Sequence, residues 1–157
     1  MKMRNRLLPE LNRRHFLAAS GGSVLVSAFP LQSFADQEDL TQARTDLFGD
    51  RQITEGRVTV KLPPIAENGH SVPLKVSVDS PMTAEDHVKQ IAIFSPRNPL
   101  PLIAQFHLTP LSGKAVVSSR IRMSGTQAIQ AVAEMSDGTL WSGSMETVVT
   151  LAACVVL

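Results

Sequence analysis

The fold is decided by the stretch RVTVKLPPIAENGHSVPLKVSV, residues 57–78. Within it, apolar residues recur at every second position in two runs, 58–62 and 72–78. Because successive side chains of a strand point to opposite faces of a sheet, this spacing predicts two strands, each with one buried face. The prolines between the runs cannot continue a ladder of hydrogen bonds, and Asn68-Gly69 is a pair that tolerates positive φ. The stretch therefore predicts two strands joined by a turn.

The same rhythm continues through the rest of the chain. Further strands are predicted at residues 88–94, 103–108, 115–123, 129–135 and 140–157, separated by turns rich in proline, glycine and serine. Before the first strand, Leu40, Ala43, Arg44 and Leu47 are spaced as on one face of a helix, which Gly49 ends. Seven short strands and one helix predict an all-β fold, an immunoglobulin-like antiparallel β-sandwich with a short N-terminal helix.

The first residues have the pattern of an export signal. Arg13 and Arg14 are followed by a bulky apolar pair, and residues 18–34 are uncharged and largely apolar. This pattern is typical of a twin-arginine signal peptide. Small residues before Asp36 predict cleavage after Ala35. We therefore expect a signal at residues 1–35, one domain at residues 36–157, a periplasmic location, and no membrane segment after cleavage.

Removal of the signal changes the charge of the chain. Residues 36–157 contain 10 Lys plus Arg and 13 Asp plus Glu, a net charge of −3 with neutral histidines. Neither a basic stripe nor interleaved aromatic residues remain, so the sequence predicts no binding of nucleic acid. A domain of this length is large enough to bury a substantial core.

Residues that could carry out chemistry are few and scattered. His70, His87 and His107 lack the spacing that brings metal ligands to one face, so no metal site and no cofactor is predicted. No serine has the context of a hydrolase nucleophile, and no glycine loop could hold a phosphate. Residues 79–87, DSPMTAEDH, gather acids and an imidazole, but a turn in which Thr83 caps a short helical turn explains them better than a site does. We therefore expect a protein that is not an enzyme.

The chain has one cysteine, Cys154, within the apolar run that ends the sequence. A lone thiol cannot form an internal disulfide, and a chain end can present it to other proteins. Cys154 is therefore a candidate attachment point for a carried group. Two other interpretations stay open: a small apolar residue packed beneath the sheet, since free cysteine is often buried, and a disulfide between two chains.

Several phrases, taken together and in order, resemble the SoxY family. They are FGD at 48–50, IAENG at 65–69, VPL at 72–74, DSPM at 79–82, IAIF at 91–94, FHL at 106–108, RIR at 120–122 and VTL at 149–151. The resemblance extends over nearly all of residues 36–157. SoxY proteins are sulfur-carrier subunits of the periplasmic Sox system for thiosulfate oxidation, and a twin-arginine signal is typical of them.

The resemblance implies a non-catalytic carrier with an immunoglobulin-like fold. It would pair with a SoxZ-like subunit and be acted on by other Sox-type periplasmic enzymes. In the family, a C-terminal arm ending Gly-Gly-Cys-Gly-Gly holds the sulfur intermediate covalently on its cysteine. Cys154 takes the position of that cysteine when residues 149–151 are aligned with the strand before the arm. The alternative is a SoxY-like binding or scaffold module that does not carry sulfur.

The arm of this chain differs from the family's glycine-rich arm. Leu151, Ala152, Ala153 and Val155 surround Cys154, and a second valine follows. Glycine permits many backbone conformations, whereas β-branched valine favours extended structure. We therefore expect an arm that is stiffer and more apolar, and that pairs or packs against a sheet.

Overall fold

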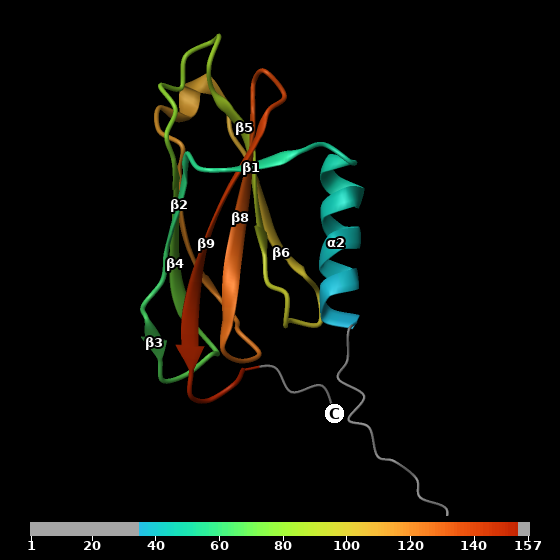
Figure 1. Cartoon of the computed structure of the whole chain (residues 1–157). Coiled ribbons are helices and arrows are strands. Elements are labelled where there is room, and N and C mark those ends of the chain that lie inside the picture. Colours follow the sequence, from blue (N-terminus) through green and yellow to red (C-terminus); the bar gives the residue numbers. More distant parts are fainter. Residues whose placement is uncertain (1–34, 154–157) are drawn as a thin grey trace, which may run out of the picture. The chain divides into compact units, whose positions relative to one another are not determined.

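The alternating stretches of the sequence pair into two facing sheets in the computed structural model, which describes residues 35–153 (Figure 1). In chain order the elements are α2 (Ala35–Phe48), β1 (Ile53–Glu55), β2 (Val58–Lys61), β3 (Ile65–Ala66), β4 (Val72–Val78), β5 (Val88–Phe94), β6 (Leu102–His107), the 3-10 helix η1 (Pro110–Ser112), β7 (Val116–Ile121), β8 (Gln127–Met135) and β9 (Leu140–Val149). The all-β sandwich with a short N-terminal helix is therefore confirmed.

The strands divide between a small sheet and a large one. The small sheet has the order β2-β4-β7 and is antiparallel throughout. The large sheet has the order β1-β9-β8-β5-β6, and its β9-β8-β5-β6 part is antiparallel. Strands β1 and β3 were not predicted, because runs of only three and two residues show no period. Both pair in parallel with β9, with Ile53 opposite Leu140 and Ile65 opposite Val148.

The main core lies between the two sheets. Strand β4 alternates buried and exposed side chains, as the sequence predicts, and its Val76 is fully buried. From the opposite sheet, Ile91, Ile93 and Ile129 meet these side chains, and none of the three is exposed. Burial of apolar surface at about 25 cal/mol per Å² makes this layer the main source of stability.

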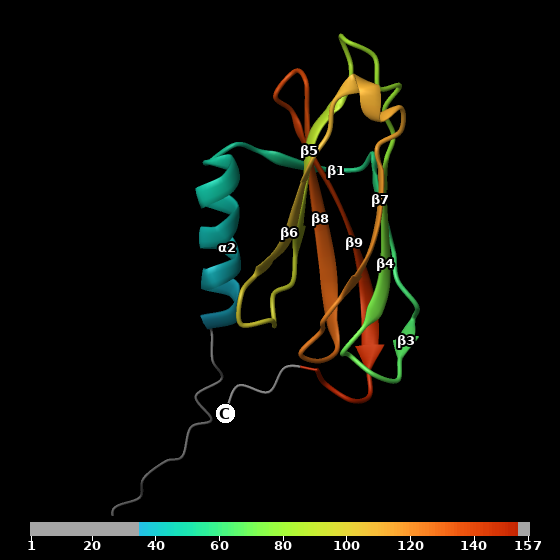
Figure 2. The same cartoon turned by 180° about the vertical axis from the view of Figure 1, so that it is seen from behind.

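A second apolar cluster lies on the other side of the large sheet, under helix α2 (Figure 2). Phe48 packs edge-on against Phe94 with ring centroids 6.4 Å apart. Leu40 and Leu47 of the helix pack against the same cluster, which contains Val132 of the sheet. Because α2 covers this face, β5 and β8 are buried on both sides and carry continuous apolar runs instead of a strict alternation.

The two sheets lie in close contact where β2 passes β9. A Cβ added to Gly143 of β9 would lie 2.1 Å from the carbonyl oxygen of Val58. The contact continues on both sides, since Gly56 N–H donates to the carbonyl of Ser142 at 2.9 Å and Leu62 N–H donates to the sulfur of Met145 at 3.2 Å. Glycine is therefore required at 143 for space.

The last strand ends earlier than the sequence predicts. The pattern predicted one extended stretch over residues 140–157, whereas β9 ends at Val149 and residues 150–153 form bends. The physical reason is that only Thr150 still bonds to a strand, through its N–H to the carbonyl of Ala66 at the end of β3, whereas the backbone of residues 151 and 153 bonds to two loops at the end of the sandwich. Residues 154–157 lie outside the described residues.

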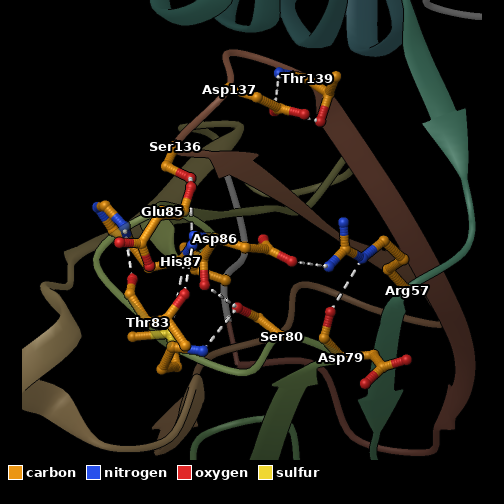
Figure 3. Close-up of polar contacts among 12 residues, drawn as sticks. Arg57, Asp79, Ser80, Thr83, Glu85, Asp86, His87, Ser136, Asp137 and Thr139 are labelled. Carbon is orange, nitrogen blue, oxygen red and sulfur yellow. Dashed lines mark hydrogen bonds and ion pairs between the residues drawn. The ribbon is translucent and has the colours of Figure 1, made fainter.

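The turn between β8 and β9 contains a carboxylate whose charge favours the native state. Asp137 Oδ1 accepts hydrogen bonds from Thr139 N–H at 2.8 Å and from the Thr139 hydroxyl at 2.7 Å (Figure 3). These bonds, the backbone one first, lower the pKa of Asp137 below its ordinary value. The unfolded chain therefore binds a proton more readily than the native chain does, and acid removes this stabilisation.

We expect Asp137→Asn to weaken the acid sensitivity of folding. The wild-type contribution is complete above the ordinary aspartate pKa of about 4 and is lost as the pH falls through the lower native value. Urea unfolding at about pH 6 and about pH 3 should show a smaller loss of stability in the variant than in the wild type. An equal loss in both proteins would contradict the expectation.

Candidate functional site

The root of the C-terminal arm is held by backbone hydrogen bonds at one end of the sandwich. Gly69 N–H donates to the carbonyl of Leu151 at 2.8 Å, and Ala153 N–H donates to the carbonyl of Met123 at 3.0 Å. The two loops are joined to each other, because Met123 N–H donates to the carbonyl of Gly69 at 2.9 Å. We call this set of residues, Gly69, Met123, Leu151 and Ala153, the arm clamp. Residues 151 and 153 of the arm are thus bonded to loops of the domain and not to a sheet.

Gly69 is needed in the clamp for its small size. A Cβ at this position would lie 2.3 Å from the carbonyl oxygen of Met123 and 3.0 Å from the backbone nitrogen of Ala153. The pair Asn68-Gly69 tolerates positive φ, but neither residue has one. Asn68 serves the turn differently, since its Oδ1 accepts the N–H of His70 at 2.7 Å. Glycine is thus required at position 69 because there is no space for a Cβ, and not because of a positive φ. The sequence pattern alone does not distinguish these two reasons.

Further bonds anchor the end of β9 just before the clamp. Thr150 N–H donates to the carbonyl of Ala66 at 3.1 Å, and the Thr150 hydroxyl donates to the carbonyl of Glu67 at 2.7 Å. Val149 N–H donates to the hydroxyl of Thr126 at 3.0 Å. Every described residue from 149 to 151 therefore has a bond to a loop, and the arm leaves the domain from a fixed position.

The predicted arm residues differ in their surroundings. Leu151 is 60% exposed although its carbonyl is bonded, whereas Ala152 and Ala153 are half-buried. Cys154 and Val155 lie outside the described residues, as do residues 1–34 of the predicted export signal, which include Arg13 and Arg14. The structure thus defines the root of the arm up to the residue before the cysteine.

The acidic segment at residues 79–87 forms a closed turn (Figure 3). Thr83 and Asp86 bond to each other twice, since Asp86 N–H donates to the Thr83 hydroxyl and Thr83 N–H donates to the Asp86 carbonyl, both at 3.0 Å. The Asp86 carboxylate pairs with Arg57 at 3.4 Å, and His87 Nδ1 lies 3.1 Å from the Thr83 carbonyl. The predicted turn is present and the Thr83 hydroxyl caps a backbone N–H, but the backbone bends there without the predicted helical turn.

Arg57 links this turn to the only tryptophan of the chain. Its guanidinium lies 5.7 Å from the centre of the Trp141 ring, and its Nε donates to the carbonyl of Asp79 at 2.9 Å. Arg57 itself has a positive φ of 53°, which is uncommon for a residue with a Cβ. Trp141 is half-buried and packs against the main core, so this cluster joins the ends of β2, β4 and β9 structurally.

Residues 35–153 contain no group of three His, Cys, Asp or Glu side chains that could hold a metal ion. Within the same residues, no helix has both the length and the apolar character needed to span a bilayer.

Comparison with known protein families gives one match. The family model "Sulfur oxidation protein SoxY" matches residues 44–154, a range that ends at the cysteine. The chain belongs to the SoxY family. The resemblance expected from the short sequence phrases is thereby confirmed. Comparison with curated proteins gave no significant match.

A solved SoxY structure supports this membership. The sulfur carrier protein SoxY from Chlorobium limicola f thiosulfatophilum is 34% identical to this SoxY chain, with a TM-score of 0.62. The match covers 73% of this chain and 99% of the Chlorobium protein. This SoxY chain is therefore a sulfur-oxidation protein related to a sulfur carrier.

More distant structures share only the fold of SoxY. The superoxide reductase (neelaredoxin) from Ignicoccus hospitalis has a TM-score of 0.53 at 17% identity, covering 60% of this chain and 80% of its own. A putative superoxide reductase from Thermotoga maritima has a TM-score of 0.50 at 17% identity, covering 64% and 87%. Because the same sandwich serves different functions, these matches give the architecture and no activity.

Proposed function

We propose that this SoxY chain carries a sulfur intermediate covalently on Cys154 during thiosulfate oxidation and presents it to partner enzymes. The observation that carries the proposal is the family match, which extends through residue 154 and so includes the cysteine. The arm clamp adds support, because it fixes the residue before Cys154 at one end of the domain. The relative from Chlorobium is itself described as a sulfur carrier protein.

The chemistry of this role needs a thiol and partner enzymes. Joining the Cys154 thiolate to the outer sulfur of thiosulfate forms a sulfur–sulfur bond and releases two electrons, which a partner oxidoreductase must accept. Hydrolysis of the resulting S-thiosulfonate by a partner enzyme breaks its terminal sulfur–sulfur bond: water adds to the sulfonate sulfur, which leaves as sulfate, and a persulfide stays on the cysteine. The chain thus supplies the attachment atom, and the partners supply catalysis.

The proposal includes the surroundings in which this chemistry takes place. The chain would reach the periplasm through the twin-arginine signal at residues 1–35 and lose that signal after Ala35. It would act as a heterodimer with a SoxZ-like subunit. Because the twin-arginine route moves folded proteins, such a subunit could be exported together with this chain even without a signal of its own.

Mass spectrometry tests the proposal directly. The protein is expressed with its own signal in a thiosulfate-oxidising host and purified from the periplasm during growth on thiosulfate. We expect the mass of residues 36–157 plus a sulfur-containing adduct on Cys154 that dithiothreitol removes. The Cys154→Ser variant should carry no adduct, because a hydroxyl does not form the sulfur–sulfur bond.

Two outcomes would count against sulfur carriage. An unmodified Cys154 while thiosulfate is being oxidised would favour the binding or scaffold module. A dimer that disappears on reduction and is absent from Cys154→Ser would show a disulfide between two chains. Non-reducing gel electrophoresis distinguishes the second outcome from the first.

A further inference from the structure

The outer face of the small sheet carries only positive charge. Strands β2, β4 and β7 contain three cations, Lys61, Lys75 and Arg120, and none of the 13 acidic residues that follow residue 35. All three cations are exposed and belong to the outward-facing set of their strands. The domain as a whole is acidic, with a net charge of −3, so this face is distinguished from the rest of its surface.

Two of these cations oppose each other without a compensating acid. Lys61 and Lys75 are direct cross-strand partners in the β2–β4 ladder. Like charges in this arrangement destabilise a sheet. Neither ammonium group forms an ion pair or a hydrogen bond with any other residue in the range 35–153. The pair is therefore unfavourable for folding and free to meet negative charge from outside.

The cations line an open groove. It has a volume of about 550 Å³, and its walls include Lys61, Lys75, Arg120, Ser118, Pro63 and Pro73. Arg120 is held in position, because its Nε donates to the Ser71 hydroxyl at 2.6 Å and a second nitrogen donates to the Ser71 carbonyl at 2.8 Å. The groove thus combines a fixed guanidinium with two unpaired ammonium groups and presents no carboxylate.

The groove lies at the same end of the sandwich as the arm clamp. Strand β2 leads into Pro64, whose carbonyl accepts the N–H of Val148 at 3.1 Å. Strand β4 begins shortly after Gly69, and β7 ends shortly before Met123, both of which belong to the clamp. Figures 1 and 2 both show the end of β4 next to β3 lying close to the end of β9.

We propose that this groove is a docking surface for a carboxylate-rich surface of a partner protein that acts on the arm. Charge complementarity argues for the occupant, since three cations without an acid attract a negatively charged surface and speed its encounter. The openness of the groove suits an extended protein segment better than a small ion, which needs an enclosed site. The role of the partner rests on the proposed carrier function, but docking itself does not need Cys154.

Nuclear magnetic resonance tests the docking with a defined probe. The isotope-labelled exported protein is titrated with an end-blocked octaglutamate peptide. We expect shifts of amides in β2, β4 and β7, and an affinity that falls with added sodium chloride. Lys61→Gln/Lys75→Gln should weaken binding about tenfold, whereas Lys61→Arg/Lys75→Arg should retain it. The control Lys89→Gln/Lys114→Gln makes the same change of net charge at exposed lysines outside the groove and should bind as the wild type does.

Three results would overturn the inference. Equal weakening in the two glutamine double variants would show general charge attraction. Shifts confined to other elements would show that the peptide binds elsewhere. Sodium thiosulfate or sodium sulfate can be added at a concentration equal to that of the carboxylate groups in the peptide titration. If either salt shifts the same amides to saturation, the groove is a site for a small oxyanion and not for a protein segment. Repeating the titration with Cys154→Ser separates docking from carriage, because binding should be unchanged even if no sulfur adduct ever forms.

Discussion

Gly143→Ala is expected to lower the free energy of unfolding by about 3 kcal/mol. The added Cβ would lie 2.1 Å from the Val58 carbonyl oxygen and 2.9 Å from the Val58 carbonyl carbon. Both atoms belong to the backbone of β2, so no side-chain rotation relieves the contact. The two sheets would have to separate locally, and the melting temperature should fall by about 10 °C. Urea unfolding and thermal unfolding both measure this loss.

Gly138→Ala provides the matched control. Gly138 has a φ of +85° and nothing within 4 Å of an added Cβ, so the substitution changes only backbone conformation. It should cost about 1 kcal/mol. Ser144→Ala is a second control, because Ser144 follows Gly143 directly and is exposed. It should change the free energy of unfolding by less than about 0.5 kcal/mol. A loss for Gly143→Ala no larger than that for Gly138→Ala would contradict the argument from close approach.

Gly69→Ala is expected to open the arm clamp. Its Cβ would lie 2.3 Å from the Met123 carbonyl oxygen, the atom that accepts the Ala153 N–H. To make room, the loops must separate, which breaks the bonds that hold Leu151 and Ala153. We expect a stability loss of about 2 kcal/mol and amide hydrogen exchange at Met123 and Ala153 that is at least about tenfold faster.

Hydrogen exchange distinguishes release of the arm from general destabilisation. The exchange rate of amides in the centre of β5 should change only as much as the global stability changes. The exchange rate of the Ala153 amide should increase by more than that change in stability explains. Gly113→Ala, at a positive φ in open space, is the control for a glycine outside the clamp. Retained protection of Ala153 in Gly69→Ala would show that the clamp does not depend on the size of residue 69.

The sandwich could be predicted because its strands carry period-two patterns bounded by turn residues. Residues 72–78 show the pattern most clearly, since β4 is buried on one face only. The position of α2 could not be predicted in the same way. The apolar runs of β5 and β8 follow from burial on both faces, which the sequence shows only once a helix is known to cover the second face.

The candidate site was predictable only in part. Cys154 stands out as the only cysteine, and the family resemblance gives it a role. The arm clamp depends on backbone groups of Gly69 and Met123, which carry no signal of hydrogen bonding in the sequence. The groove escaped prediction for a related reason, because Lys61, Lys75 and Arg120 are far apart in the chain and meet only through strand register.

If the proposed carriage holds, the arm clamp also limits how far a sulfur on Cys154 could travel. Successive Cα atoms are about 3.8 Å apart, so the Cys154 sulfur can lie no more than about 7 Å from the Cα of Ala153. With the Ala153 N–H bonded to Met123, the point from which that distance is counted is fixed at the end of the sandwich. An enzyme with a shallow, open active site can reach it there, whereas one with a deep channel requires the clamp to open first. On the proposed function, the depth of a partner's active site and the strength of one backbone hydrogen bond would together decide which enzymes could reach Cys154.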